Sequence, residues 1–229
     1  MTDLLTIKQF KDFLTQHQQK TFKKGEIIVF QGEVPRGAFV VKSGVVKAYN
    51  LSTNGDEKPV AFYGPDSNFP GPWVYGKMAN STYYYEAFTP EVTVYMIERD
   101  EFVRFIKSRP QFIYQELERY ISDELGKSMR LNALQHSKAS DKLLYTLHYL
   151  SLSHGKKIAP QKIEITLDLT HQDFANLTGL TRETAATELN KLKKANIIEY
   201  GKAKAYTLDL SKLMKLLNDE YIADLDIKL

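Results

Sequence analysis

The chain has 229 residues, of which 43% are hydrophobic and 26% charged, and its formal net charge is +3. This composition excludes a disordered or fibrous chain, and the length predicts two modest domains. The sequence contains no cysteine, which excludes disulfides, cysteine-held iron–sulfur clusters and thiol-based redox sensing.

The start of the chain and its apolar runs indicate a protein that is neither secreted nor inserted in a membrane. Asp3, Lys8, Lys11 and Asp12 interrupt the apolar stretch that a secretory signal needs. No apolar run approaches the roughly 18 residues of a membrane span. We therefore expect a cytoplasmic protein with no membrane partner.

The first hundred residues predict a short helix followed by a β-rich domain. Residues 4–18 have Phe10, Phe13 and Leu14 among polar neighbours, which predicts an amphipathic helix. Short runs rich in Val, Ile, Phe and Tyr then predict strands at residues 27–30, 39–41, 45–49, 60–63, 83–88 and 92–97. Glycines separate these runs, and Asn54-Gly55 predicts a type I′ hairpin turn. We expect a compact antiparallel barrel or roll.

The pattern becomes helical from Arg99, and residues 111–138 predict one helix about 42 Å long. One stripe of this helix is apolar, and its members are Ile113, Leu117, Tyr120, Ile121, Leu125 and Leu131. A helix of this length exceeds what one small domain covers, so we expect the stripe to form a homodimer interface. The alternative is that the stripe packs entirely within its own chain.

The region from residue 139 to residue 170 contains further regular elements. A helix follows Ala139, with Leu143, Leu147 and Leu150 at its apolar positions. Residues 153–157 predict a polar loop, and residues 162–167 alternate strictly, which predicts a strand. Thr170 is placed to cap another helix.

Residues 171–189 match a helix-turn-helix position by position. Ala175 is small where the two helices cross, Gly179 permits the turn, and Thr181 caps the second helix. The apolar face that holds the helices together consists of Phe174, Leu177, Ala185, Leu189 and Leu192. The segment therefore predicts a DNA-binding motif.

The second helix of this motif carries side chains suited to reading base edges, namely Arg182, Glu183, Ala186 and Thr187. Residues 197–200 and 205–208 predict two strands that form a wing. Candidate contacts to the DNA backbone are Thr170, Gln172, Thr181, Lys191, Lys194, Lys202 and Lys204. The alternative is that Arg182 and Glu183 are only a solvated first turn, and that single lysines are plain surface.

Three segments resemble the family of the catabolite activator protein and FNR: FKKGEIIVFQGE (22–33), VVKSGVVK (40–47) and LTRET (180–184). The resemblance spans nearly the whole chain. It implies an α+β fold with a cyclic-nucleotide-binding-like β-roll (residues 1–110), a long dimerisation helix (111–138) and a winged helix-turn-helix (139–229). It also implies a homodimer that binds a palindromic site in double-stranded DNA and contacts RNA polymerase.

The sequence departs from this family where its members bind a cyclic nucleotide. Those members use a Gly-Glu pair and an Arg-Ser pair to hold the ribose and the cyclic phosphate. Here Pro72 follows Gly71, and no arginine occurs between residues 36 and 99, so we expect no cyclic AMP. We expect no haem, because residues 18–135 contain no histidine, and no iron–sulfur cluster, because cysteine is absent.

Aromatic side chains occupy the position of the family's ligand pocket. Together with Gly71, the candidates for an effector pocket are Phe62, Trp73, Tyr83, Tyr84 and Tyr85. Such a pocket would take an unknown aromatic or apolar small molecule. The alternative is that the rings fill the core of the roll, and this is our expectation.

We therefore predict a sequence-specific DNA-binding transcription regulator that is not an enzyme. An effector could shift an equilibrium between DNA-competent and incompetent states, or the protein could be active whenever it is expressed. A cupin-like enzyme is the competing class, but it needs clustered His and Glu ligands inside a barrel that here has no histidine. The family often has a second arginine where Thr187 stands, so we expect a DNA site changed at the position that faces Thr187.

Overall fold

The computed structural model describes residues 4–200 and 205–217, and its contacts divide the chain into two units, residues 1–117 and 118–229. The boundary falls within the longest described helix, α4 (Pro110–Gln135). The domain boundaries that we expect at residues 110 and 138 stay a prediction. Over the described ranges, no helix is both long and apolar enough to cross a membrane.

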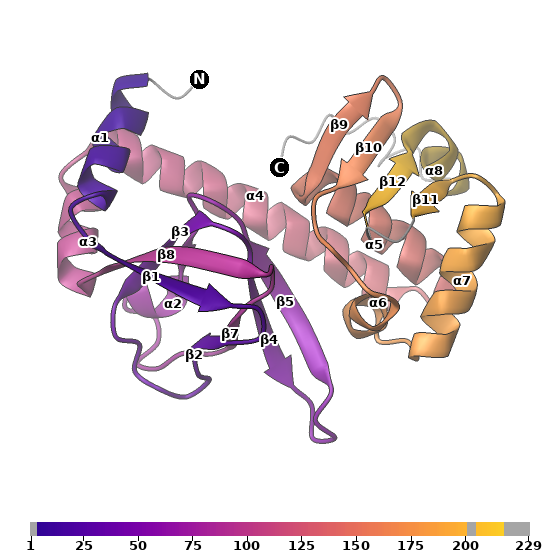
Figure 1. Cartoon of the computed structure of the whole chain (residues 1–229), viewed down its shortest axis with the longest axis horizontal. Helices are drawn as coiled ribbons and strands as arrows, with labels where there is room; N and C mark the ends of the chain where they lie inside the picture. The colour runs from indigo at the N-terminus through magenta and orange to yellow at the C-terminus, as the bar shows by residue number, and fades with distance from the viewer. Residues whose placement is uncertain (1–3, 201–204, 218–229) are drawn as a thin grey trace. The chain divides into compact units, whose positions relative to one another are not determined.

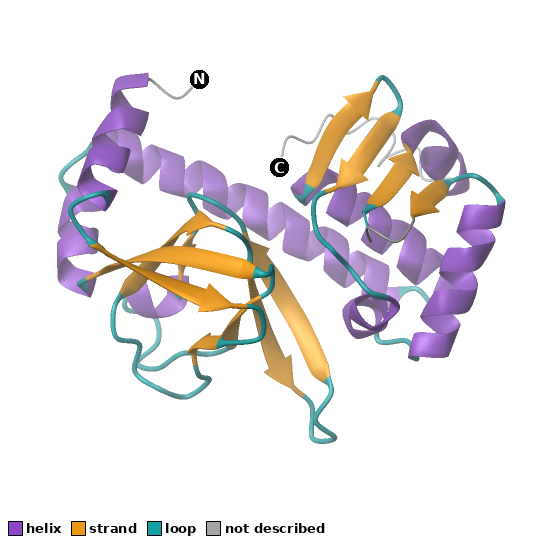
Figure 2. Ribbon diagram, viewed as in Figure 1, coloured by secondary structure: helices purple, strands orange, loops and turns teal. Residues whose placement is uncertain are grey.

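The first unit contains a β-roll, whose strands are orange in Figure 2 and labelled in Figure 1. Its elements before α4 are α1 (Leu4–Leu14), β1 (Gln18–Lys23), β2 (Ile27–Val29), β3 (Ala38–Ser43), β4 (Val46–Leu51), β5 (Glu57–Tyr63), β6 (Asn68–Phe69), α2 (Gly71–Val74), β7 (Tyr84–Ala87), β8 (Glu91–Ile97) and α3 (Arg99–Lys107). They form two antiparallel sheets with the strand orders β1-β8-β3-β6 and β2-β7-β4-β5. The predicted antiparallel roll is confirmed.

Strand β3 shows how the roll builds two cores from one strand. Successive side chains of a strand point to opposite faces. Phe39 and Val41 belong to one buried cluster with Tyr85 of β7, whereas Ala38 and Val40 belong to a second one. Buried residues of α2, α3 and the start of α4 complete the second cluster. Because both faces are covered, the strand is a continuous apolar run.

Two predictions for the first unit are wrong in detail. The first helix ends at Leu14 rather than residue 18, because residues 18–23 pair with β8 as strand β1. Only Phe22 of that strand is buried, so the sequence has no apolar alternation there. The turn at Asn54-Gly55 is not type I′, which needs two positive φ angles. Gly55 has a φ of 83°, but Asn54 has no positive φ.

The second unit contains a central helix, a four-stranded antiparallel sheet and the predicted helix-turn-helix. Its elements after α4 are α5 (Ala139–Ser153), β9 (Gly155–Ala159), β10 (Lys162–Ile165), α6 (His171–Thr178), α7 (Arg182–Lys194), β11 (Ile198–Tyr200), β12 (Tyr206–Asp209) and α8 (Leu210–Leu217). The sheet has the strand order β11-β12-β10-β9. The predicted polar loop at residues 153–157 is wrong. Residues 155–159 pair with β10 as an edge strand with largely exposed side chains, which gives no apolar pattern.

Candidate DNA interface

The turn between α6 and α7 has the geometry that the sequence predicts. Gly179 ends α6 with a φ of 67°, a conformation that residues with a side chain rarely adopt. Ala175 and Ala185 are 1% and 0% exposed, so small side chains lie where the helices pack. The predicted apolar face is buried, and it consists of Phe174, Leu177, Ala185, Leu189 and Leu192.

Threonine side chains begin both helices. The Thr170 hydroxyl accepts a hydrogen bond from the Asp173 amide (3.2 Å), and the Asp173 carboxylate accepts one from the Thr170 amide (2.7 Å). This capping box satisfies donors that the first turn of α6 leaves free. The Thr181 hydroxyl likewise accepts from the Thr184 amide (3.2 Å). The predicted cap at Thr181 is confirmed.

The first turns of α7 present polar side chains to solvent. Arg182, Glu183 and Thr187 are exposed, whereas Ala186 is half-buried. Glu183 lies in the first turn of α7, where the helix dipole favours an acid. The first two turns of the helix therefore expose a guanidinium, a carboxylate and a hydroxyl.

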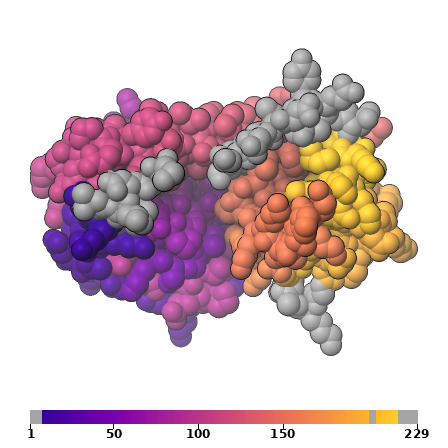
Figure 3. Space-filling model, turned by 90° about the horizontal axis from the view of Figure 1, so that it is seen from above, coloured from indigo at the N-terminus to yellow at the C-terminus, as the bar shows by residue number. Residues whose placement is uncertain are grey.

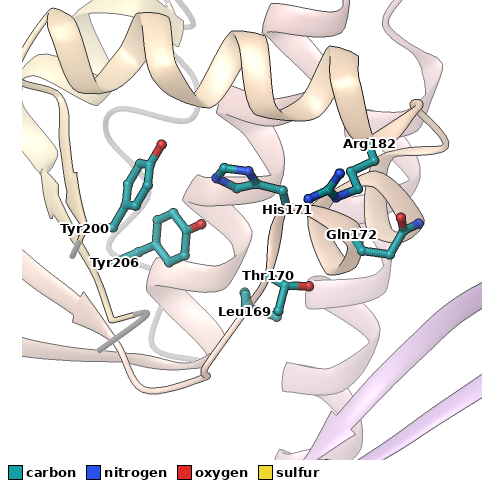
Figure 4. Close-up of a pocket in the computed structure, with 7 residues that line it drawn as sticks. All are labelled: Leu169, Thr170, His171, Gln172, Arg182, Tyr200 and Tyr206. Atoms are coloured by element: carbon teal, nitrogen blue, oxygen red, sulfur yellow. The ribbon is translucent and has the colours of Figure 1, made fainter. Parts of the chain in front are cut away.

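An open cavity of about 350 Å³ lies beside Arg182, between the starts of α6 and α7 and the strands β11 and β12 (Figure 4). Its lining residues are Leu169, Thr170, His171, Gln172, Arg182, Tyr200 and Tyr206. In Figure 4 the His171 ring lies between Tyr200 and Arg182. Three predicted DNA-contacting residues, Thr170, Gln172 and Arg182, thus meet at one cavity.

Sequence reasoning missed four lining residues, namely Leu169, His171, Tyr200 and Tyr206. The His171 and Tyr200 rings meet edge to face at 5.8 Å, and the Tyr200 and Tyr206 rings are 4.8 Å apart. Burial raises the pKa of both tyrosine hydroxyls above the usual 10, so both remain neutral donors. The sequence signal was weak, since only the position of His171 between Thr170 and Gln172 could have indicated it.

The lysines that follow the first turns differ in their surroundings. Lys191 forms an ion pair with Glu188 at 2.7 Å, and Lys194 is exposed. Lys193 instead binds Tyr200, at the end of β11. Lys202 and Lys204 lie outside the described residues. Strands β11 and β12 pair as the predicted hairpin, with Tyr200 opposite Tyr206.

Comparison with known proteins identifies both halves of the chain. Residues 19–109 match the model of the cyclic nucleotide-binding domain, and residues 142–216 match that of the Crp-like helix-turn-helix domain. The global nitrogen regulator of Synechocystis sp. is 30% identical over 187 residues, which cover 81% of this chain and 82% of that protein. The chain belongs to the CRP/FNR family of transcription regulators. The fumarate and nitrate reduction regulatory protein of Vibrio cholerae is 24% identical, with 87% and 78% of the two chains covered.

Solved structures show the same fold for this CRP/FNR regulator. FixK2 from Bradyrhizobium japonicum superposes with a TM-score of 0.72 at 18% identity, covering 87% of this chain and 96% of that one. The α+β arrangement of a β-rich domain, a long helix and a C-terminal helix-turn-helix is therefore confirmed.

The six candidate pocket residues of the roll belong to several different packing groups, and their role in an effector pocket stays a prediction. Tyr83 packs against the cluster that contains Tyr85, and Tyr85 is 0% exposed. Tyr84 stacks on the Tyr49 ring at 5.4 Å, on the other face of β7. The remaining three are elsewhere: Phe62 contacts Phe88, Trp73 belongs to the second cluster, and Gly71 begins α2.

The apolar stripe of α4 lies at the surface of the chain. Its six predicted residues are between 39% and 59% exposed, namely Ile113, Leu117, Tyr120, Ile121, Leu125 and Leu131. The space-filling view in Figure 3 shows the pink residues of α3 and α4 at the surface.

In the described ranges, no group of three or more His, Asp or Glu side chains could hold a metal ion.

Proposed function

We propose that this CRP/FNR regulator binds a two-fold symmetric DNA site as a homodimer and controls transcription there. The exposed first turns of α7 carry this proposal, because α6 and the turn at Gly179 hold them at the surface. Arg182 donates to the O6 and N7 of a guanine, and Glu183 accepts from a cytosine amino group. Ala186 and Thr187 complete the reading surface, and Thr187 reads a base pair that differs from the family's usual site.

Contacts to the DNA backbone come from both ends of the motif. Thr170 and Gln172 lie at the start of α6, where backbone amides and the helix dipole favour a phosphate. Thr181 lies at the start of α7, which favours a phosphate in the same way. Lys191 and Lys194 lie in the last turn of α7. Lys202 and Lys204, in the residues that join β11 to β12, supply further cations. These groups set register and affinity without reading sequence.

The homodimer forms along the apolar stripe of α4. Large apolar side chains that are about half exposed are costly to leave in water when they form a continuous row. A second copy of the same helix buries such a row symmetrically. Replacing Ile121 by Glu should therefore convert the dimer to monomers in sedimentation equilibrium, whereas the same change at exposed Lys127 should leave it intact.

The roll acts without cyclic AMP, haem or an iron–sulfur cluster. Pro72 stands where cyclic-nucleotide-binding members carry a glutamate, and the rings of Phe39, Phe69 and Tyr85 stack on one another inside the roll. The second unit (residues 118–229), which we call the winged unit, thus binds DNA without a nucleotide, or an aromatic or apolar effector controls its DNA binding. We assign the chain no catalytic activity, a cytoplasmic location and RNA polymerase as a partner.

Selection from random duplex DNA tests the proposed function. The purified protein without additives should enrich an inverted repeat, with an affinity that falls steeply as salt rises. Recovery of no inverted repeat, with or without cyclic AMP and aromatic metabolites, would contradict the proposal. Enrichment only in the presence of an aromatic metabolite would support gating by that effector. In a separate measurement, cyclic AMP should leave the midpoint temperature of thermal unfolding unchanged.

A further inference from the structure

Tyr200 connects three elements of the winged unit. Its hydroxyl donates to the Asn190 side-chain oxygen of α7 at 2.9 Å. Its backbone carbonyl accepts from the Lys193 ammonium, also at 2.9 Å. The same ammonium lies 4.3 Å from the centre of the Tyr200 ring, and the ring contacts His171 at the start of α6. One residue of β11 thus bonds twice to α7, the proposed recognition helix, and packs on α6.

These contacts matter because Tyr200 lies at the end of a short edge strand. Strand β11 is at the edge of its sheet and pairs only with β12 among the described strands. Tyr200 is its last residue, opposite Tyr206, and residues 201–205 join the two strands. An edge strand of three residues has few hydrogen bonds of its own. Contacts from outside the sheet are therefore needed to fix its end.

We propose that Tyr200 is a positioning residue that fixes the wing relative to the recognition helix. This inference rests on the proposed function, because it concerns how Lys202 and Lys204, the wing lysines, contact DNA while Arg182 reads bases. In this role the Lys193 ammonium binds Tyr200 and does not contact a DNA phosphate. The end of β11, from which the chain continues toward Lys202 and Lys204, is thus held by α7 in the free protein.

The alternative role for Tyr200 is a direct hydrogen bond from its hydroxyl to a DNA phosphate. In the free protein this hydroxyl already donates to the Asn190 side-chain oxygen. The two roles predict different couplings. A direct contact acts independently of the wing lysines, whereas a positioning residue acts through them.

The decisive variant is Tyr200→Phe, which keeps the ring contacts and removes only the hydroxyl. Loss of one neutral hydrogen bond should raise hydrogen exchange at the β11 and β12 amides by about three- to tenfold. Asn190→Ala should have a similar effect, and the double variant should be no worse than either single one. Tyr145→Phe in α5 is a matched control that should leave these amides unchanged.

DNA binding then separates the two roles. Tyr200→Phe should weaken binding to all sequences by about three- to tenfold and leave the preference at the Arg182 base pair unchanged. In a Lys202→Ala background the same change should have almost no effect. Full additivity of the two changes, or unchanged exchange in β11 and β12, would overturn the positioning role. The exchange measurement needs no DNA, so it still decides the role of Tyr200 if the proposed function fails.

Discussion

Lys47 in the roll and Arg182 in the winged unit are cations in opposite environments. Lys47 is 4% exposed, pairs with Glu57 and Glu86, and lies 4.6 Å from the Tyr49 ring. Arg182 is exposed at the rim of a cavity. A buried charge must be neutralised inside the protein, whereas an exposed one is free to meet an external anion. Lys47 is therefore neutralised within the roll, whereas Arg182 is accessible to an external anion.

The tyrosines of the two regions differ in the same way. In the roll, Tyr85 stacks on Phe69 at 5.0 Å and fills the space between the sheets. In the winged unit, Tyr200 and Tyr206 line an open cavity. Aromatic side chains thus form a closed interior in one region and line a surface recess in the other, because the recess lies where two helix starts meet a hairpin.

The largest effect tests whether the roll's interior is core or pocket. Tyr85→Ala should cost about 3 to 5 kcal/mol of the free energy of unfolding of the first unit, because a fully buried ring is replaced by a cavity. Urea unfolding measures this value. Tyr84→Ala, on the opposite face and half-buried, is the matched control and should cost about 1 kcal/mol. A smaller loss for Tyr85 than for Tyr84 would mean that the ring lines a ligand site.

The second effect depends on histidine, which the winged unit contains and residues 18–135 do not. Burial lowers the pKa of the His154 imidazole from 6.5 to about 4. Between these values the unfolded chain binds a proton that the folded chain does not. The free energy of unfolding of the second unit should therefore decrease as pH falls from 6.5 to 4, by on the order of 3 kcal/mol.

His154→Gln is the variant that checks this assignment. Urea unfolding at several pH values should show a flatter pH dependence than in the parent chain. Some dependence should remain, because burial also lowers the pKa of His148. An unchanged slope would show that His154 does not titrate differently in the folded and unfolded chains.

The next effect separates base reading from backbone contact. Arg182→Ala should weaken binding to the selected site by about 1 to 3 kcal/mol and relax the preference at one base pair. Lys194→Ala should weaken binding to all sequences about equally and reduce the salt slope by about one. Competition gel shifts against single-base variants of the site measure both. If both variants kept the same base preferences, our division of roles would be wrong.

The smallest effect concerns the start of α6. Thr170→Ala removes the hydroxyl of the capping box and should cost about 1 kcal/mol of the free energy of unfolding of the second unit. Thr170→Ser keeps the hydroxyl and should restore most of it. Thermal unfolding checks both variants. A loss of DNA affinity in Thr170→Ala without a loss of stability would show that the hydroxyl serves the proposed DNA contact and not the cap.

Local patterns in the sequence predicted much of the fold but missed elements that only pairing creates. The helix-turn-helix was predictable because Gly179, Thr181 and the apolar face each have a local physical reason. Strands β1 and β9 were not, because their side chains are mostly exposed and their hydrogen bonds come from distant partners. The helices α2 and α8 were also missed, since four and eight residues give little periodicity.

The sequence by itself determined the order of the parts, and it motivates the proposals that Arg182 and Glu183 read bases and that the family's phosphate-binding pair is lost. Each of these depends on residue type or on spacing within a few turns of chain. Only the tertiary structure decided that the aromatic residues of the roll are dispersed over several contacts, and that Lys193 binds Tyr200. Those outcomes depend on which strands pair and which helix packs beside them, and short-range sequence patterns carry no information about such contacts.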